Sequence, residues 1–316
     1  MTSRPTLDEI GAARERIAGT AARTPLVRLD VDGDVYLKLE NVQPIGSFKL
    51  RGAANAIGLA SPGELANGVW TASAGNMAQG VAWCARSLGA ACTVVVPDTA
   101  PQAKLVAIER LGAQLVLVSP DEWLDVFRTR EHKGMEGVFV HAFSDRNVMA
   151  GNGTIGLELL EDLPDVETVL VPYGGGGLSC GIASALRELK PGCRVYACEV
   201  ETAAPLAPSL EAGEPVRVEW AKTFVDGIGA PEVFPEMFEH ARELLDGSLV
   251  VTLEETAAAV RLLAERAHVI AEGAGAVPVA AALSGRAGGG KIACVVSGGN
   301  IDAAVLAVIL RGGRLR

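Results

Sequence analysis

Short apolar runs alternate with helical patterns along most of this 316-residue chain. The runs lack the strict polar–apolar alternation of a half-exposed strand, so both faces of each predicted strand must be covered. Parallel strands joined through helices meet this requirement, because each crossover lays a helix against the sheet. We therefore predict an α/β protein with mostly parallel sheets. The predicted strands are 35–40, 69–72, 92–96, 114–118, 138–140, 168–172, 194–199, 250–252 and 291–296.

Helices are predicted between these strands, and the first has a recognisable start. Thr6 stands before a helical pattern and Glu9 follows three residues later, which is the arrangement of a capping box. The segment 201–248 is rich in proline, glycine and charge and supports no assignment. Two α/β lobes that share one cleft, divided near 145–150, are the economical arrangement. The predicted helices are 6–18, 48–59, 76–89, 102–112, 121–131, 151–162, 178–189, 254–268 and 301–311.

The composition limits the kinds of partner. A net charge of −10 argues against nucleic acid or an anionic membrane surface. The chain has no run of 18 apolar residues, and its charged N-terminal helix pattern differs from a signal peptide, so we expect a cytoplasmic protein without a membrane partner. Only 4% of the residues are aromatic, which leaves small aliphatic side chains to build the core.

The cysteine and histidine residues form no recognisable metal or redox motif. The six cysteines stand singly among alanine, valine and glycine, with no C-x-x-C pair and no histidine at ligand spacing. They are predicted to be small buried apolar side chains. The four histidines are equally scattered, so neither a zinc site nor a histidine-based triad is predicted.

A run of four glycines, here called the glycine loop, follows a predicted strand and precedes a predicted helix. It consists of Gly174, Gly175, Gly176 and Gly177. Without Cβ atoms the backbone can turn sharply and direct successive N–H groups at an anion. The next helix adds the positive end of its dipole. The sequence therefore predicts a phosphate-binding loop, whose ligand is a dinucleotide, a nucleotide or a cofactor such as pyridoxal phosphate.

The segment 46–52, here called the lysine loop, carries a lysine at the start of a predicted helix. The helix dipole disfavours a cation at that position. Partial desolvation beside the positive helix end would lower the pKa of Lys49 and give a neutral amine able to form a Schiff base. On this loop alone, an exposed surface lysine is the alternative.

Two further loops occupy similar positions. The asparagine loop, 73–80, opens a helix whose free N–H groups suit a substrate carboxylate, although Asn76 could serve simply as a helix N-cap. The serine loop, 297–300, follows the last predicted strand, and Ser297 is either a ligand contact or a turn or cap residue. In open α/β sheets, ligands collect at the edge where these strands end.

Together the four loops resemble the β-family (fold type II) of pyridoxal-phosphate enzymes, and most closely its serine/threonine dehydratase and serine racemase branch. The resemblance covers nearly the whole chain. It rests on Ser-Phe-Lys-x-Arg-Gly at 47–52, Ser-x-Gly-Asn-x-x-Gln at 73–79, the tetraglycine at 174–177 and Ser-Gly-Gly-Asn at 297–300. Glu272 stands in a segment that resembles one beside the family's cofactor ring.

The resemblance implies a tryptophan synthase β-like fold of two lobes, each an open, mostly parallel twisted sheet flanked by helices. Residues 1–47 and 148–316 would form the large cofactor-binding lobe, and residues 48–147 the smaller lobe. It also implies a pyridoxal-phosphate-dependent lyase that eliminates the β-hydroxyl of an amino acid and yields a 2-oxo acid and ammonia. L-threonine, L-serine, phenylserine and hydroxyaspartate are candidate substrates, and a homodimer is expected.

The resemblance further assigns roles to residues. Lys49 would form the Schiff base and then act as the base for the α-proton, with Phe48 beside the cofactor ring. Ser297 would contact the pyridine nitrogen. The implied cofactor-binding residues are Phe48, Lys49, Asn76, Gly174, Gly175, Gly176, Gly177, Leu178 and Ser297. The implied substrate-binding residues are Ser73, Ala74, Gly75, Asn76 and Met77.

Some positions depart from the family pattern. Racemases of this branch carry a serine where this chain has Ala74, which cannot transfer a proton, so racemase activity is expected to be weak or absent. Met77 replaces a common histidine and implies a more apolar pocket. The family's cation site combines a glutamate, a backbone carbonyl and an aspartate; Glu199 and Ala203 match, but Pro205 stands third, so no metal is predicted.

Other functions remain as alternatives. A dinucleotide-binding protein would explain the glycine loop and Glu199, which ends a predicted strand 25 residues after Gly174. However, these glycines are too crowded for G-x-G-x-x-G, and Lys49 and the serine loop would have no role. A β-replacement enzyme such as cysteine synthase, or an amino-acid racemase, is the alternative within the family. Cysteine synthases resemble Gly-Asn-Thr-Gly at the asparagine loop, which this chain lacks.

Overall fold

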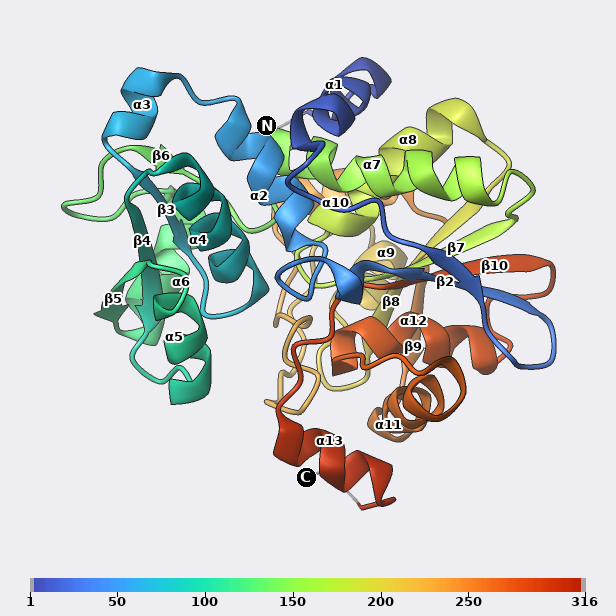
Figure 1. The fold of residues 1–316 in the computed structure, drawn as a ribbon. Coiled ribbons are helices and arrows are strands. Elements are labelled where there is room, and N and C mark those ends of the chain that lie inside the picture. The colour runs from blue at the N-terminus through green and yellow to red at the C-terminus, as the bar shows by residue number, and fades with distance from the viewer. Residues whose placement is uncertain (1–2, 314–316) are drawn as a thin grey trace.

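The computed structural model describes residues 3–313, and its strands form two sheets (Figure 1). The larger sheet contains β1 (Leu26–Arg28), β2 (Asp34–Leu39), β7 (Thr168–Pro172), β8 (Arg194–Val200), β9 (Ser248–Val251) and β10 (Lys291–Val296). The smaller sheet contains β3 (Val69–Ala72), β4 (Cys92–Pro97), β5 (Gln114–Val118) and β6 (Val138–Phe139). The strand orders are β1-β2-β10-β7-β8-β9 and β5-β4-β3-β6. Neighbouring strands are parallel except β1 with β2, so the predicted α/β fold with mostly parallel sheets is confirmed.

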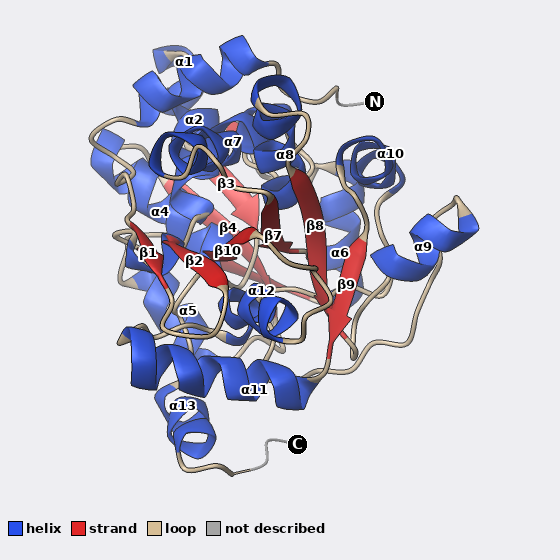
Figure 2. Cartoon of the chain, turned by 90° about the vertical axis from the view of Figure 1, so that its right-hand side faces the viewer, coloured by secondary structure: helices blue, strands red, loops and turns tan. Residues whose placement is uncertain are grey.

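Helices cover both faces of the larger sheet, as buried parallel strands require. One face carries α7 (Arg146–Asp162), α8 (Gly177–Leu189) and α10 (Pro235–Leu244), which share an apolar core with Val169 and Val171 of β7. The other face carries α11 (Leu253–Leu262) and α12 (Gly273–Leu283), which pack with Leu170. Successive side chains of a strand point to opposite faces, which explains this division. Figure 2 shows α7 and α8 above the strands and α11 below them.

The smaller sheet has its own apolar core, formed with the helices around it. These helices are α2 (Lys49–Gly58), α4 (Asn76–Leu88), α5 (Gln102–Glu109) and α6 (Pro120–Thr129). The chain also forms α1 (Leu7–Ile17), η1 (Glu40–Val42), α3 (Pro62–Ala66), α9 (Leu206–Ala212), η2 (Leu263–Ala267) and α13 (Ala303–Leu310). None of the helices in the described part of the chain combines the length and apolar character needed to cross a bilayer.

Most predicted elements are present within a few residues. The first helix begins with the predicted capping box, in which the Glu9 N–H donates to the Thr6 hydroxyl and the Thr6 N–H donates to the Glu9 carboxylate. The predicted helix 151–162 begins earlier, at Arg146, because the side chain of Asp145 caps it. The sequence pattern therefore located both helices. For α7 it missed the start, because the residue that caps this helix lies before the predicted range.

Three α-helices of seven residues or more in the described part of the chain were absent from the prediction. The sequence predicts no helix over 273–283, but α12 occupies this segment and is buried almost throughout. Its glycines, its internal Pro278 and its lack of an amphipathic period conceal it, since a helix that is apolar on every side belongs in a core. The helices α9 and α10 lie within 201–248, where no pattern was resolved.

Helix α7 packs closely against both α2 and α8 at glycines. A Cβ atom on Gly153 of α7 would stand 2.8 Å from the carbonyl oxygen of Gly181 on α8. A Cβ atom on Gly52 of α2 would stand 3.0 Å from the carbonyl oxygen of Val148 on α7. Backbones approach this closely only where side chains are absent. Helix α7 therefore connects the helix that begins at Lys49 with the helix that follows the glycine loop.

Candidate active site

Hydrogen bonds join the lysine loop to the serine loop. The Phe48 N–H donates to the Ser297 carbonyl oxygen at 3.0 Å, and the Gly299 N–H donates to the Gly46 carbonyl oxygen at 2.9 Å. These loops follow β2 and β10, which are neighbours in the larger sheet. Parallel neighbours end at the same edge of a sheet, where ligands of such folds bind. The strand order thus brings together two loops that are about 250 residues apart in the chain.

Lys49 is the first residue of α2, and its side chain is partly buried. Its Nζ donates to the Ala142 carbonyl oxygen at 2.6 Å and lies 5.0 Å from the centre of the Phe48 ring. Burial disfavours the ammonium form and lowers the pKa of Lys49 to about 8, although the charge of Glu272 opposes this shift. Lys49 is therefore a desolvated amine inside the protein and not an exposed surface lysine.

Asn76 connects the asparagine loop to the serine loop. Its Oδ1 accepts a hydrogen bond from Asn300 Nδ2 at 2.8 Å, and its Nδ2 donates to Glu272 Oε1 at 2.9 Å. The N-cap residue of α4 is Gly75, and no described side chain caps this helix. The simple N-cap interpretation of Asn76 is therefore wrong, because its side chain points away from its own helix to the larger sheet's loops.

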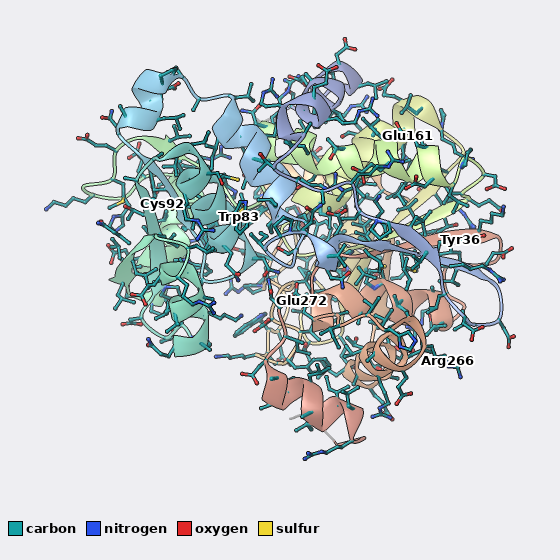
Figure 3. All side chains as sticks on the ribbon, viewed as in Figure 1. Tyr36, Trp83, Cys92, Glu161, Arg266 and Glu272 are labelled. Atoms are coloured by element: carbon teal, nitrogen blue, oxygen red, sulfur yellow. The ribbon has the colours of Figure 1, made fainter. Side chains whose placement is uncertain are left out.

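Glu272 is a site residue that sequence reasoning noted only by resemblance and did not include among the site residues. It is 6% exposed and precedes α12, at the end of that helix that faces the smaller sheet (Figure 3). Burial raises the pKa of Glu272 to about 7, while the hydrogen bond from Asn76 opposes this shift. A carboxyl group with such a pKa beside a desolvated amine is typical of a functional site. In the sequence, the only local feature that could have pointed to Glu272 is its position directly before a glycine- and alanine-rich segment.

The glycine loop forms a tight turn before α8. Gly176 has a φ of 86°, which favours glycine, and a Cβ atom on Gly177 would stand 2.6 Å from the Phe143 carbonyl oxygen. No side chain within the described residues caps α8, so the N–H groups at its start are available to an anion. The Leu178 side chain packs in the apolar core, so only its backbone could take part in binding an anion. This cradle fits the phosphate of pyridoxal phosphate.

Helix α7 also contacts the glycine loop through Asn152. This residue is 1% exposed, and its Nδ2 donates to the Gly177 carbonyl oxygen at 3.1 Å. Its Oδ1 is buried and has no hydrogen-bond partner among residues 3–313. Asn152 therefore supports the backbone of the glycine loop from within α7.

The remaining predicted site residues lie on the asparagine and serine loops. Ser297 is 2% exposed and is not the N-cap of the following helix. The Ser73 hydroxyl accepts a hydrogen bond from the Gly75 N–H at 3.2 Å, and Ala74 between them is partly buried. Met77 is 1% exposed and belongs to the apolar core of the smaller sheet, so its contact with a substrate stays a prediction.

The residues at the family's cation site do not fit a divalent ion. Glu199 Oε1 accepts from the Leu206 N–H at 2.9 Å, and its Oε2 accepts from the Ala207 N–H at 2.9 Å and the Ser248 hydroxyl at 2.6 Å. Both oxygens are thus occupied at the start of α9, where Pro205 supplies no carboxylate. Within the described chain, no group of three acidic, histidine or cysteine side chains could hold a metal ion.

Curated proteins of similar sequence carry the names L-threonine ammonia-lyase and L-threonine dehydratase. The chain is 42% identical to an L-threonine ammonia-lyase of Thermotoga maritima, over 98% of this chain and 79% of that protein. It is 38% identical to a catabolic L-threonine dehydratase of Staphylococcus aureus, over 97% of this chain and 92% of that protein. Both alignments extend across the four loops of the site.

Solved structures and a family model give the same relationship. A maize serine racemase superimposes with a TM-score of 0.90 at 31% identity and covers 98% of each chain. A threonine deaminase of T.th. superimposes with a TM-score of 0.87 at 36% identity, over 94% of this chain and 99% of that one. The model of the family described as pyridoxal-phosphate dependent enzyme matches residues 17–298. This chain therefore belongs to the family of pyridoxal-phosphate dependent enzymes.

Proposed function

We propose that this enzyme eliminates the β-hydroxyl of a β-hydroxy-α-amino acid and releases a 2-oxo acid and ammonia. L-threonine and L-serine are the first candidate substrates, followed by phenylserine and hydroxyaspartate. The relatives named as threonine ammonia-lyase and threonine dehydratase support this choice. The observation that carries the proposal is the desolvated amine of Lys49, whose pKa is lowered to about 8 at the meeting point of the loops.

Residues from all four loops are proposed to hold the cofactor. Lys49 would attach it and Phe48 would pack against its ring, while Asn76 would bind the ring hydroxyl and Ser297 the ring nitrogen. The glycine loop and the Leu178 backbone would bind the phosphate through N–H groups. When bound, pyridoxal phosphate withdraws electrons from the α-carbon of an amino acid and stabilises the charge left by the departing α-proton. The neutral hydroxyl of Ser297 does not require a protonated ring nitrogen.

Lys49 is proposed to accept the α-proton of the substrate at Nζ. A general base must be neutral to accept a proton, and the lowered pKa of Lys49 raises the neutral fraction of its amine. The Ala142 carbonyl oxygen accepts a hydrogen bond from this amine at 2.6 Å, which orients a long, flexible side chain. An amine that donates an N–H in this way keeps its lone pair available for the incoming proton.

The start of α4 is proposed to bind the carboxylate of the substrate. Its first N–H groups are not capped by any side chain of the described residues, and the helix dipole favours an anion there. Ala74 has no acidic group, so it cannot donate a proton to the face of the substrate's α-carbon opposite Lys49. Racemisation should therefore be weak or absent. The proposed substrate-binding residues are Ser73, Ala74, Gly75, Asn76 and Met77.

A substrate panel tests the proposed reaction. The purified enzyme is incubated separately with threonine, serine, threo-3-hydroxyaspartate and phenylserine, and the release of 2-oxo acid and of ammonia is measured. We expect equal amounts of the two products from at least one of these amino acids. Inversion of the α-carbon without release of ammonia would contradict the proposal and favour a racemase. Product formation only with an added thiol would favour a β-replacement enzyme.

We also propose that the cleft lies between a large lobe of residues 1–47 and 148–316 and a smaller lobe of residues 48–147. The origin of each sheet's strands supports this division, because the strands of the smaller sheet all come from 69–139. A cytoplasmic homodimer completes the proposal and rests on the family resemblance alone. Sedimentation of the purified enzyme tests the dimer, and a monomer at micromolar concentration would overturn it.

A further inference from the structure

A short turn at 141–144 contacts both halves of the proposed cofactor site. The carbonyl oxygen of Ala142 accepts the hydrogen bond from Lys49 Nζ at 2.6 Å. The next residue, Phe143, lies against the glycine loop, and a Cβ atom on Gly175 would overlap its ring. The position of this turn therefore determines both the direction of the lysine amine and the shape of one wall beside the glycine loop.

The side chain of His141 fixes the backbone of this turn. His141 is 1% exposed, and its Nδ1 accepts hydrogen bonds from the N–H of Ser144 at 2.8 Å and of Phe143 at 3.2 Å. Because Nδ1 accepts, the ring proton lies on Nε2, which donates to the Phe127 carbonyl oxygen at 3.2 Å. Both ring nitrogens are thus used within the protein, and the side chain has no remaining group for a substrate.

The surroundings of His141 keep its ring neutral. Burial, together with the nearby charge of Arg130, lowers the pKa of His141 to about 3. Aromatic rings pack edge-on around the imidazole, and these rings offer it no other hydrogen-bond partner. These rings belong to Phe127, Phe139, Phe143 and Phe234. The Nδ1 atom is therefore a permanent acceptor throughout the pH range in which the enzyme works.

Ser144, the last residue of the turn, forms hydrogen bonds with residues of two different helices. Arg130, at the end of α6, donates to the Ser144 carbonyl oxygen at 2.8 Å. The Ser144 hydroxyl donates to Glu236 of α10 at 2.8 Å. These bonds fix Ser144 but do not contact Ala142 or Phe143. A backbone bond from the Asp145 N–H to the Phe143 carbonyl oxygen at 3.0 Å also belongs to the turn, and the His141 ring supplies the side-chain acceptor for the Phe143 and Ser144 N–H groups.

We propose that His141 is a positioning residue for catalysis: it holds Ala142 against the amine of Lys49 and Phe143 against the glycine loop. This inference rests on the proposed function, because it takes Lys49 as the base and as the point of cofactor attachment. A displacement of about 1 Å in such a group can cost about a hundredfold in rate. An oriented site also binds its ligand more tightly, because less order must be imposed on binding.

Two substitutions at His141 separate positioning from packing. In His141→Asn, the side-chain oxygen can accept the N–H two residues later, as asparagine does in Asx turns, so the turn is retained. In His141→Leu, the volume is similar but both N–H groups lose their acceptor. We expect kcat of the leucine variant to fall about 10- to 100-fold, with the KM for the amino acid nearly unchanged. The asparagine variant should recover most of this loss.

A neighbouring substitution controls for general destabilisation. Phe139→Leu removes an aromatic contact with the His141 ring but no hydrogen bond of the turn. We expect a lower melting temperature with kcat within about twofold of the unaltered enzyme. If His141→Leu also leaves kcat and cofactor affinity within that range, the positioning role is overturned. The same conclusion follows if the asparagine variant is as inactive as the leucine variant at equal stability.

Cofactor affinity provides a readout that does not depend on turnover. The dissociation constant of pyridoxal phosphate, followed by its absorbance, should rise about tenfold in His141→Leu and less in His141→Asn. If the unaltered enzyme releases no 2-oxo acid from any β-hydroxy amino acid, the proposed function fails, whereas this measurement still decides the role of His141. If His141→Leu does not fold, His141→Phe, which keeps an aromatic ring but has no acceptor, replaces it, and unchanged kcat and affinity there overturn the proposal.

Discussion

Helix α2 contributes one residue to each of two groups of buried ionisable side chains: Arg51 to the first and Lys49, two residues earlier, to the second. The hydrogen-bond partners in the two groups differ. Arg51 is 1% exposed and donates to Glu40 at 2.8 and 2.9 Å and to Glu158 at 2.7 and 2.9 Å. Lys38 is fully buried, with its Nζ 2.6 Å from a Glu158 oxygen. We call these four residues the paired cluster. The second group, Lys49 with Glu272, is called the site pair.

The site pair has neutral hydrogen-bond partners where the paired cluster has opposite charges. Lys49 donates to a backbone carbonyl, and Glu272 accepts from the amide of Asn76. Burial therefore dominates, and it lowers the pKa of Lys49 to about 8 and raises the pKa of Glu272 to about 7. Burial would also raise the pKa of Glu40, but the charge and hydrogen bonds of Arg51 hold it below its usual value.

The difference shows that burial alone does not make a charged residue functional. A buried charge with an ion partner and satisfied hydrogen bonds stays charged and serves the structure. A buried charge with neutral partners titrates near physiological pH and can exchange protons. In this chain the paired cluster fixes α2 between η1 and α7, so that the site pair two residues away can remain reactive.

The largest effect is expected from removal of the site pair's amine. Lys49→Ala should reduce 2-oxo acid release at least about a thousandfold, because it removes both the cofactor attachment and the proposed base. It should also remove the absorbance of tightly bound cofactor. Lys133→Ala, at an exposed lysine, is the matched control and should retain full activity. Residual turnover in Lys49→Ala near that of the control would refute the assignment.

Breaking the paired cluster should affect stability. Arg51→Met leaves the carboxylates of Glu40 and Glu158 buried without an arginine, which is expected to cost about 3–5 kcal/mol in the free energy of unfolding. Urea unfolding measures this change. The control Arg28→Met removes an exposed pair with Asp34 and should cost less than about 1 kcal/mol. Equal losses in the two variants would show that the cluster is not strongly coupled.

Glu272 should make the stability of the cofactor-free protein depend on pH. Its pKa in the folded state, about 7, lies above its usual value of 4.5, so the unfolded chain loses this proton first as the pH rises. The group's contribution therefore decreases by about 3 kcal/mol between these two pH values. Glu272→Gln cannot titrate and should lack this component. Urea unfolding at pH 5 and pH 7.5 measures it, and parallel curves for the two proteins would argue against a raised pKa.

The smallest of these effects concerns the protonation of Lys49 during turnover. If the neutral amine accepts the α-proton, kcat should rise by about tenfold between pH 7 and pH 9 and then level off, because the pKa is about 8. The pH dependence of kcat at saturating substrate measures this limb. A flat profile over this range would show that proton abstraction by Lys49 does not limit the rate.

Local sequence patterns were sufficient for much of the fold and for the central residues of the site. The capping box at Thr6 and the apolar strands are recognisable because their signals lie within a few residues. The same holds for the glycine loop and for Lys49, whose position at a helix start is unusual for a cation. By contrast, α12 escaped prediction because a helix buried on all sides has no amphipathic period.

The sequence by itself determined the fold class, the family resemblance and the candidate residues on the four loops, but it did not include Glu272 among them. Only the tertiary structure decided their partners. Asn76 could have been a helix cap until its hydrogen bonds to Glu272 and Asn300, about 200 residues later in the chain, were known. The pKa shift of Glu272 and the acceptor role of His141 likewise depend on burial and on contacts between distant segments. Such contacts follow from strand order and helix packing, which no local pattern encodes.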